Sequence, residues 1–128
     1  MKVVSLPTTG RTKMAMISLP MTGRTKESIQ ERWNAAAAHL REQGYVVVDT
    51  IHVDEVATPE EAMAQGVKEY SLMCLGEVLT LMSTCDAVYF CNGWMDSRGC
   101  KIEYEAAKAY GRELLFEREH MRTNESLD

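Results

Sequence analysis

Short apolar runs typical of buried β-strands alternate with segments of helical periodicity along most of this chain. The expected strands span residues 15–19, 45–49, 87–91 and 113–116, and the expected helices span 26–43, 70–83 and 99–111, with a shorter helix beginning near residue 58. Such alternation is typical of sheets whose strands are joined by helical crossovers. It predicts an α/β fold: a flavodoxin-like or Rossmann-like parallel sheet of four to five strands, with helices on both faces.

The expected helices carry recognisable start and stop signals. Gly44 ends the first helix, and Thr58 followed by Pro59 is a good N-cap and first position for the second. The apolar stripe of the first helix is Ile29, Trp33, Ala36 or Ala37, and Leu40. Trp33 is therefore expected in the core rather than as a base-stacking surface. The helix at 70–83 is expected to turn inward Leu75, Val78, Leu79 and Met82.

The segment from Asp86 to Tyr110 carries the main functional signal. An apolar strand is followed by a glycine-bearing loop, 92–98, that opens directly into a helix. Because the first N–H groups of a helix lack internal partners and lie at the positive end of its dipole, this junction is suited to bind an anion. Ser97 occupies the expected N-cap position, and Gly99 lacks a Cβ that would keep a ligand from the backbone.

Glu103 is the residue of this helix with the most chemical potential. Helical spacing places it between Gly99 and Ala107, at the edge of the core stripe and facing the loop. The core stripe is expected to consist of Ile102, Ala106, Ala109 and Tyr110. The solvated face is expected to carry Lys101, Glu105 and Lys108. On this pattern alone, Glu103 is open between a surface glutamate and a functional carboxylate.

The pattern SxGxxxExxxA at 97–107, preceded by a strand that begins at Asp86, resembles the signature of the nucleoside 2-deoxyribosyltransferase superfamily. The string CDAVYFCNGWMDSRGCKIEYEAAKAYG and the loop SLPMTGRTK at 18–26 are similar to an uncharacterised branch of that superfamily in bacterial and phage genomes. The resemblance covers about 14–117. It implies that Glu103 attacks C1′ of a (deoxy)ribose and displaces the base, and that the protein forms at least a dimer.

One position departs from the pattern of the resembling enzymes. In those enzymes an aspartate, eight residues before the strand aspartate, helps to position the substrate and the base. Here that position is Val78, and the candidate replacements are the neighbouring Glu77, Asp86 or Asp96. The alternative is a pocket that binds or sequesters a nucleotide without turning it over. An N-glycosidase or transferase and a non-catalytic nucleotide-binding protein therefore both stay open.

Parallel sheets of this type bind ligands at the carboxyl ends of their strands. Two loops qualify, 20–26 and 92–98, and they meet if the strands at 15–19 and 87–91 are neighbours. The candidate catalytic residues are Glu103, Glu77 and Asp86, and the candidate substrate-binding residues are Ser18, Gly23, Arg24, Asn92, Trp94, Ser97, Arg98 and Gly99. Trp94 is open between contact with a base or sugar and packing over the helix.

Ser97 also bears on the charge of the ligand. In the nucleoside-using transferases that the chain resembles, this position is an aspartate, whereas the nucleotide-hydrolysing branch has a serine. A serine hydroxyl and the amides near Gly99 can donate to a phosphate, and Arg24 or Arg98 can add a charge-assisted bond. The expected ligand is therefore a (deoxy)ribonucleoside 5′-monophosphate.

Bulk properties limit the classes of partner. The 128 residues form one domain, and a net charge of −5 argues against binding to a nucleic acid polymer. No apolar run approaches membrane-spanning length and no signal peptide is evident, so no membrane partner is expected. The four cysteines lack zinc-ligand spacing and are interpreted as reduced thiols of a cytoplasmic protein. Neither a metal nor another cofactor is expected.

The N-terminus contains an internal repeat. MKVVSLPTTGRTK at 1–13 and MAMISLPMTGRTK at 14–26 align without gaps. The centre of a small sheet needs one such strand–loop unit, and the second copy runs directly into the first helix. Residues 1–13 are therefore expected to be an extension outside the core, residues 14–117 the domain, and residues 118–128 a polar tail.

Overall fold

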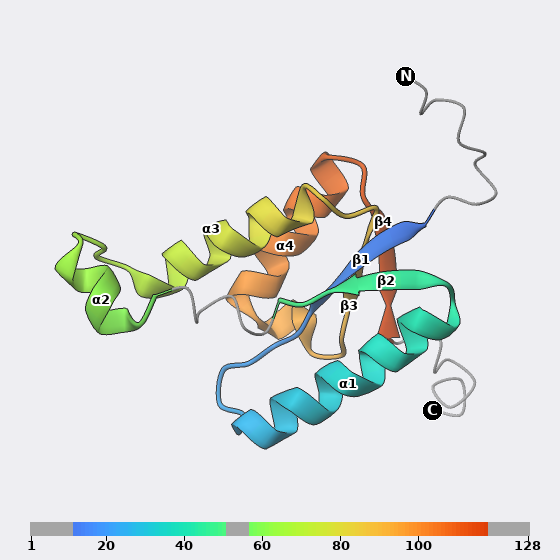
Figure 1. Cartoon of the computed structure of the whole chain (residues 1–128), viewed down its shortest axis with the longest axis horizontal. Helices are drawn as coiled ribbons and strands as arrows, with labels where there is room; N and C mark the ends of the chain where they lie inside the picture. Colours follow the sequence, from blue (N-terminus) through green and yellow to red (C-terminus); the bar gives the residue numbers. More distant parts are fainter. Residues whose placement is uncertain (1–11, 51–56, 118–128) are drawn as a thin grey trace.

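The computed structural model describes residues 12–50 and 57–117, and these residues form one parallel sheet with its helices. The sheet has four strands in the order β2-β1-β3-β4 (Figure 1). The elements are β1 (Lys13–Ser18), α1 (Lys26–Glu42), β2 (Tyr45–Val48), α2 (Pro59–Ala64), α3 (Tyr70–Met82), β3 (Ala87–Phe90), the short 3₁₀ helix η4 (Trp94–Asp96), α4 (Arg98–Ala109) and β4 (Glu113–Phe116). The predicted flavodoxin-like α/β fold is confirmed.

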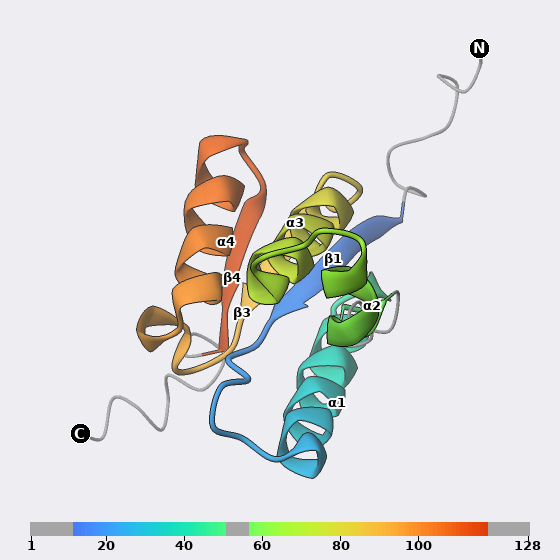
Figure 2. The same cartoon turned by 90° about the vertical axis from the view of Figure 1, so that its left-hand side faces the viewer.

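Helices cover both faces of the sheet, with α1 on one side and α3 and α4 on the other (Figures 1 and 2). Because side chains alternate along a strand, β1 sends Ile17 toward α1 and Met16 toward α3 and α4. The α1 face is a buried cluster of Ala15, Ile17, Leu19, Trp33, Ala36, Ala37, Leu40, Ala87, Tyr89 and Cys91. The opposite cluster contains Met16, Met82, Cys85, Val88, Phe90 and Ala107. The core therefore lies on both faces of β1 and β3.

Side chains cap the starts of both α1 and α2, and the N-cap predicted at Thr58 is confirmed. The Thr25 side chain accepts a hydrogen bond from the Ser28 amide at the start of α1, and Thr58 forms a capping box with Glu61 at the start of α2. Trp33 is only 7% exposed, which confirms it as a core residue. Among the described residues, no helix combines the length and apolar character needed to cross a bilayer.

The second copy of the repeat supplies the central strand. Lys13, the last residue of the expected extension, begins β1 and lies opposite Tyr45 in the register with β2. The domain therefore begins one residue earlier than expected. Residues 1–11 and the expected polar tail, 118–128, lie outside the described residues.

The expected core stripe of α4 is wrong at Ile102, Ala109 and Tyr110, although Ala106 does pack against the core. Ile102 is 42% exposed and Tyr110 80% exposed, whereas Cys100 and Ala107 are buried and Tyr104 packs on the core. The Tyr104 ring stacks on Trp94 at 4.7 Å between centroids and meets Phe90 edge-on at 5.7 Å. These aromatic contacts bury more area than Ile102 could, so they determine which side of α4 faces the sheet. This rotation carries Glu103 toward the sheet.

Candidate functional site

The loops after β1 and β3 meet at the carboxyl edge of the sheet, as the sequence predicted for neighbouring strands. The Cys91 amide donates to the Ser18 carbonyl at 3.0 Å, so the two strands remain paired up to their ends. Beyond them, a Cβ added at Gly93 would lie 3.6 Å from Pro20 Cγ and 3.7 Å from Arg24 Nη2. Arg24, which follows the turn at Gly23, therefore reaches the loop that leads into α4.

The loop after β3 leads into a capped helix N-terminus. Gly93 has a φ of +93°, which favours glycine, and η4 follows it. Ser97 is the N-cap of α4, since its Oγ accepts from the Cys100 amide at 3.3 Å. Arg98 is exposed at the first helical position, and a Cβ added at Gly99 would meet nothing within 4 Å. The predicted N-cap is confirmed, and the backbone at Gly99 is open to a ligand.

Glu103 lies one turn further along α4, half-buried on the side that faces the sheet. Burial raises the pKa of its carboxyl group to about 7, and the Ser18 side chain opposes this rise by favouring the charged form. Ser18 itself is 1% exposed, and its Oγ makes no hydrogen bond of ordinary geometry within the part of the chain that the structure describes. The Glu103 carboxylate, near the start of α4, and the Ser18 hydroxyl, at the end of β1, thus form one polar site.

A carboxyl group with a pKa near 7 can serve either as a base or nucleophile or as an acid near neutral pH. The buried thiols beside it are less suited to chemistry. Burial raises the pKa of Cys91 to about 12, against the opposing charges of Arg32 and Arg24, and burial also raises that of Cys100. Glu103 is therefore the reactive candidate in this part of the structure.

The raised pKa of Glu103 predicts a pH-dependent stability difference between the wild type and Glu103→Gln. A carboxyl that binds protons more tightly when folded makes stability fall as pH rises from about 4.5 to about 7. Glutamine has no such penalty, so the variant should be more stable at pH 8, by at most about 3.4 kcal/mol at 1.36 kcal/mol per pKa unit. The difference should vanish near pH 4. Denaturant unfolding at several pH values measures it.

The exposed Glu105→Gln is the matched control for this measurement, because Glu105 lies on the solvent face of the same helix. Its stability should follow that of the wild type across the pH range. A Glu103→Gln protein whose stability relative to the wild type does not change with pH would contradict the burial of the Glu103 charge.

The other two candidate acids, Asp86 and Glu77, differ in their surroundings. Asp86 precedes β3, and its Oδ2 accepts from the Met14 amide at 2.8 Å, at the amino edge of the sheet. The structure therefore does not bring Asp86 to Glu103. Glu77 lies on α3 beside Val78, which packs against the core cluster of that face. Glu77 Oε1 is buried and has no hydrogen-bond partner among the described residues, so a ligand could still engage it.

Trp94 packs over α4. Its ring stacks on Tyr104 and also lies 5.3 Å from the Phe90 centroid and 5.8 Å from that of Phe116. The structure therefore shows the second of the two roles left open for Trp94, an aromatic residue folded over the helix. It orders the loop that carries Ser97 rather than standing out as a stacking surface.

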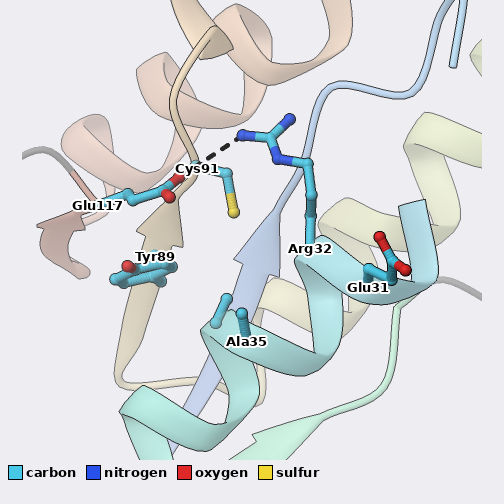
Figure 3. Close-up of a pocket in the computed structure, with 7 residues that line it drawn as sticks. Glu31, Arg32, Ala35, Tyr89, Cys91 and Glu117 are labelled. Carbon is cyan, nitrogen blue, oxygen red and sulfur yellow. Dashed lines mark ion pairs between the residues drawn. The ribbon is translucent and has the colours of Figure 1, made fainter. Parts of the chain in front are cut away.

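Sequence reasoning missed Arg32 and Glu117, both of which bind the backbone of Asn92. Arg32 extends from α1 toward Glu117, which follows β4 (Figure 3). The available signal was positional: α1 runs antiparallel to the strands, so its first turns lie at the carboxyl edge, and Arg32 precedes the buried Trp33 there. A cation in such a place faces the loops of the site.

The residues that match a known protein family coincide with the residues that form the sheet and its helices. Residues 13–116 of the 128 match the family described as "Domain of unknown function (DUF4406)". This range begins with β1 and ends with β4. A comparison with curated proteins finds no match. Since the match covers all four strands and both sides of the candidate site, the chain belongs to the DUF4406 family.

Proposed function

We propose that this protein cleaves or transfers at the N-glycosidic bond of a (deoxy)ribonucleoside 5′-monophosphate, with Glu103 as the nucleophile. The observation that carries the proposal is the placement of Glu103: half-buried beside Ser18, one turn beyond the open N-terminus of α4. It is supported by the resemblance of the 97–107 motif to the nucleoside 2-deoxyribosyltransferase superfamily. A surface glutamate would not show these surroundings.

The proposed reaction uses the ionised carboxylate. Glu103 attacks C1′ through an oxocarbenium-like transition state, so that a C1′–O bond forms while the C1′–N bond breaks and its electrons pass to the base. The departing base takes up a proton, and water or a second base then releases the sugar from Glu103. Because the negative carboxylate faces positive charge only as the transition state forms, its stabilising effect is greatest there.

The ligand's phosphate would occupy the N-terminus of α4. The amides at the start of the helix precede the first intrahelical bond, in which the Lys101 amide donates to the Ser97 carbonyl at 2.9 Å. They supply donors and the positive end of the helix dipole. Arg24, close to Gly93, is the cation on the facing loop. This arrangement favours an anionic 5′ substituent.

A second function is supported by Val78, which holds an apolar contact where the resembling enzymes have an aspartate. A protein without that acid could bind a nucleotide through the same loops and not turn it over. The separating experiment incubates the protein with nucleosides and 5′-nucleotides and follows both free base, by chromatography, and thermal shift. Base release supports the enzyme, a thermal shift without release supports the binding protein, and neither result would overturn both.

Self-association belongs to the same proposal. Of the 13 residues of α3 only Met82 is buried, although the helix is apolar apart from Glu77 and a few small polar residues. Leu72 on α3 is 64% exposed and Met63 on α2 is 68% exposed. A helix that is apolar on all sides is normally covered, and α3 itself carries a single charged residue, Glu77, so it opposes a second copy of itself little.

We expect light scattering to report a dimer for the wild type and a monomer for Leu72→Lys, because the substitution introduces a charge into the covered surface. The exposed Glu105→Gln should remain dimeric. A monomeric wild type at micromolar concentration would contradict the pairing.

The proposal places the protein in the cytoplasm, where thiols stay reduced. Cys85, Cys91 and Cys100 are buried free thiols, which agrees with such a compartment.

A further inference from the structure

Both polar groups of the Asn92 backbone are bound by side chains from distant parts of the chain. Arg32 Nη2 donates to the Asn92 carbonyl at 2.9 Å, and the Asn92 amide donates to Glu117 Oε1 at 2.8 Å. These residues come from α1 and from the end of β4, 60 and 25 positions away from Asn92. Two distant parts of the fold therefore meet at the backbone of one residue.

Arg32 and Glu117 also contact each other. Their Nη2 and Oε1 atoms lie 3.5 Å apart, and their side chains are 23% and 24% exposed (Figure 3). Pairs this far from solvent are screened less than pairs on an open surface. The two side chains and the Asn92 backbone thus make a closed three-part network, here called the Asn92 clamp.

The clamp acts on the residue that begins the candidate phosphate loop. Asn92 follows β3 and precedes Gly93, where the chain turns with a φ of +93° before η4 and Ser97. A small change in the backbone direction at Asn92 would move the chain that follows it, including the N-terminus of α4. The loop's orientation therefore depends on groups that lie outside it.

We infer that Arg32 and Glu117 are positioning residues, which hold the β3–α4 loop so that the N-terminus of α4 receives the phosphate of the ligand. This inference rests on the proposed function for the ligand's identity, but not for the clamp itself. Arg32 then acts through the Asn92 backbone, without touching the substrate and without filling the core. Its loss should weaken the binding of the phosphate-bearing ligand specifically.

The space beside the clamp gives this inference a sharp test. A cavity of about 210 Å³ lies under Arg32 and Glu117, lined also by Glu31, Ala35, Ala36, Tyr89 and Cys91. Truncation in Arg32→Ala would join the volume of the guanidinium group to this cavity. A guanidinium ion is small and planar enough to enter and to donate to the Asn92 carbonyl as Arg32 does.

The experiment measures the dissociation constants of a nucleoside monophosphate and its nucleoside by calorimetry. Arg32→Ala should weaken binding of the monophosphate about 10- to 100-fold, as the loss of a charge-assisted hydrogen bond predicts. Binding of the nucleoside should weaken by less than about threefold. Guanidinium chloride at millimolar concentration should restore much of the lost affinity, and urea, its neutral counterpart, should not. Arg41→Ala is the matched control on α1, since Arg41 lies over the Trp33 ring at 6.0 Å.

A second measurement needs no ligand. Hydrogen exchange of the Asn92 amide should be at least about tenfold faster in Glu117→Ala than in the wild type, because the acceptor is removed. In Glu117→Gln, which keeps an acceptor oxygen, exchange should be slower than in Glu117→Ala. Unchanged exchange in Glu117→Ala, or equal weakening of nucleoside and monophosphate in Arg32→Ala, would overturn the clamp. A wild type that binds no nucleotide would overturn the proposed function alone, and the exchange result would still decide on the clamp.

Discussion

Base release from a nucleoside 5′-monophosphate is expected to fall by about a thousandfold or more in Glu103→Gln, with the fold retained. Removal of the group that forms the covalent intermediate usually costs this much or more, because the remaining site only binds and orients the substrate. Glutamine keeps the shape of the side chain in its half-buried place, so the core around Ala107 and Cys100 should be unchanged. Initial rates with a chromatographic readout of the free base measure the effect.

Glu105→Gln is the control, since it removes a carboxylate from the exposed face of the same helix. It should keep activity within about twofold of the wild type. Equal rates in the wild type and Glu103→Gln would overturn the role of Glu103. Binding of the monophosphate should survive in Glu103→Gln, because the phosphate site at the start of α4 is separate from the carboxylate.

The activity and the stability of Glu103→Gln should change in opposite directions. The burial that raises the pKa of Glu103 to about 7 makes its charge a cost to the folded protein above that pH. The same burial keeps water from weakening the carboxylate's interaction with a developing positive charge. If the reactive site is maintained at a cost in stability, Glu103→Gln should be inactive and also more stable than the wild type at pH 8.

The order of elements and the meeting of two loops could be predicted because they follow from local patterns and from chain topology. Strand and helix periods are properties of short windows, and a parallel sheet with right-handed crossovers leaves few strand orders. The predicted N-caps Thr58 and Ser97 are also local, since each cap bonds an amide three residues later.

The side of α4 that faces the sheet could not be predicted in the same way. Periodicity predicted a stripe through Ile102, whereas Tyr104 faces the sheet because it packs against Phe90 on β3 and Phe116 on β4. Such contacts join residues far apart in sequence. The Asn92 clamp was missed for the same reason, because its three members lie far apart along the chain.

The location of Asp86 is a different matter, because the topology already determines it. A residue that precedes a parallel strand lies at the amino edge of the sheet, whereas ligands bind at the carboxyl edge. There the Asp86 carboxylate accepts from the Met14 amide and supports the start of the central strand. A structural role of this kind explains an aspartate before β3 without any part in catalysis.

Ser97→Asp is expected to erase or invert a preference for nucleoside monophosphates over nucleosides. In the wild type, hydrogen bonds to charged groups of about 1.5–3 kcal/mol each, before desolvation is subtracted, predict a preference on the order of tenfold to a thousandfold. Aspartate caps helices as well as serine does, so the Cys100 amide keeps its acceptor and the start of α4 should not move. What changes is the charge: a carboxylate at the N-cap repels a phosphate and takes up the donors it would use.

Ser97→Asn separates the charge from the change of side chain, because asparagine is also a good N-cap and is neutral. It should keep most of the preference that Ser97→Asp loses. Calorimetric titration of matched nucleoside and monophosphate pairs with all three proteins measures this preference. Rising salt should weaken the binding of the monophosphate and leave that of the nucleoside unchanged. Nucleosides that bind the wild type as tightly as monophosphates would show that the N-terminus of α4 does not hold the phosphate. In that case the open backbone at Gly99 and the nearby Arg24 would not form a nucleotide phosphate site.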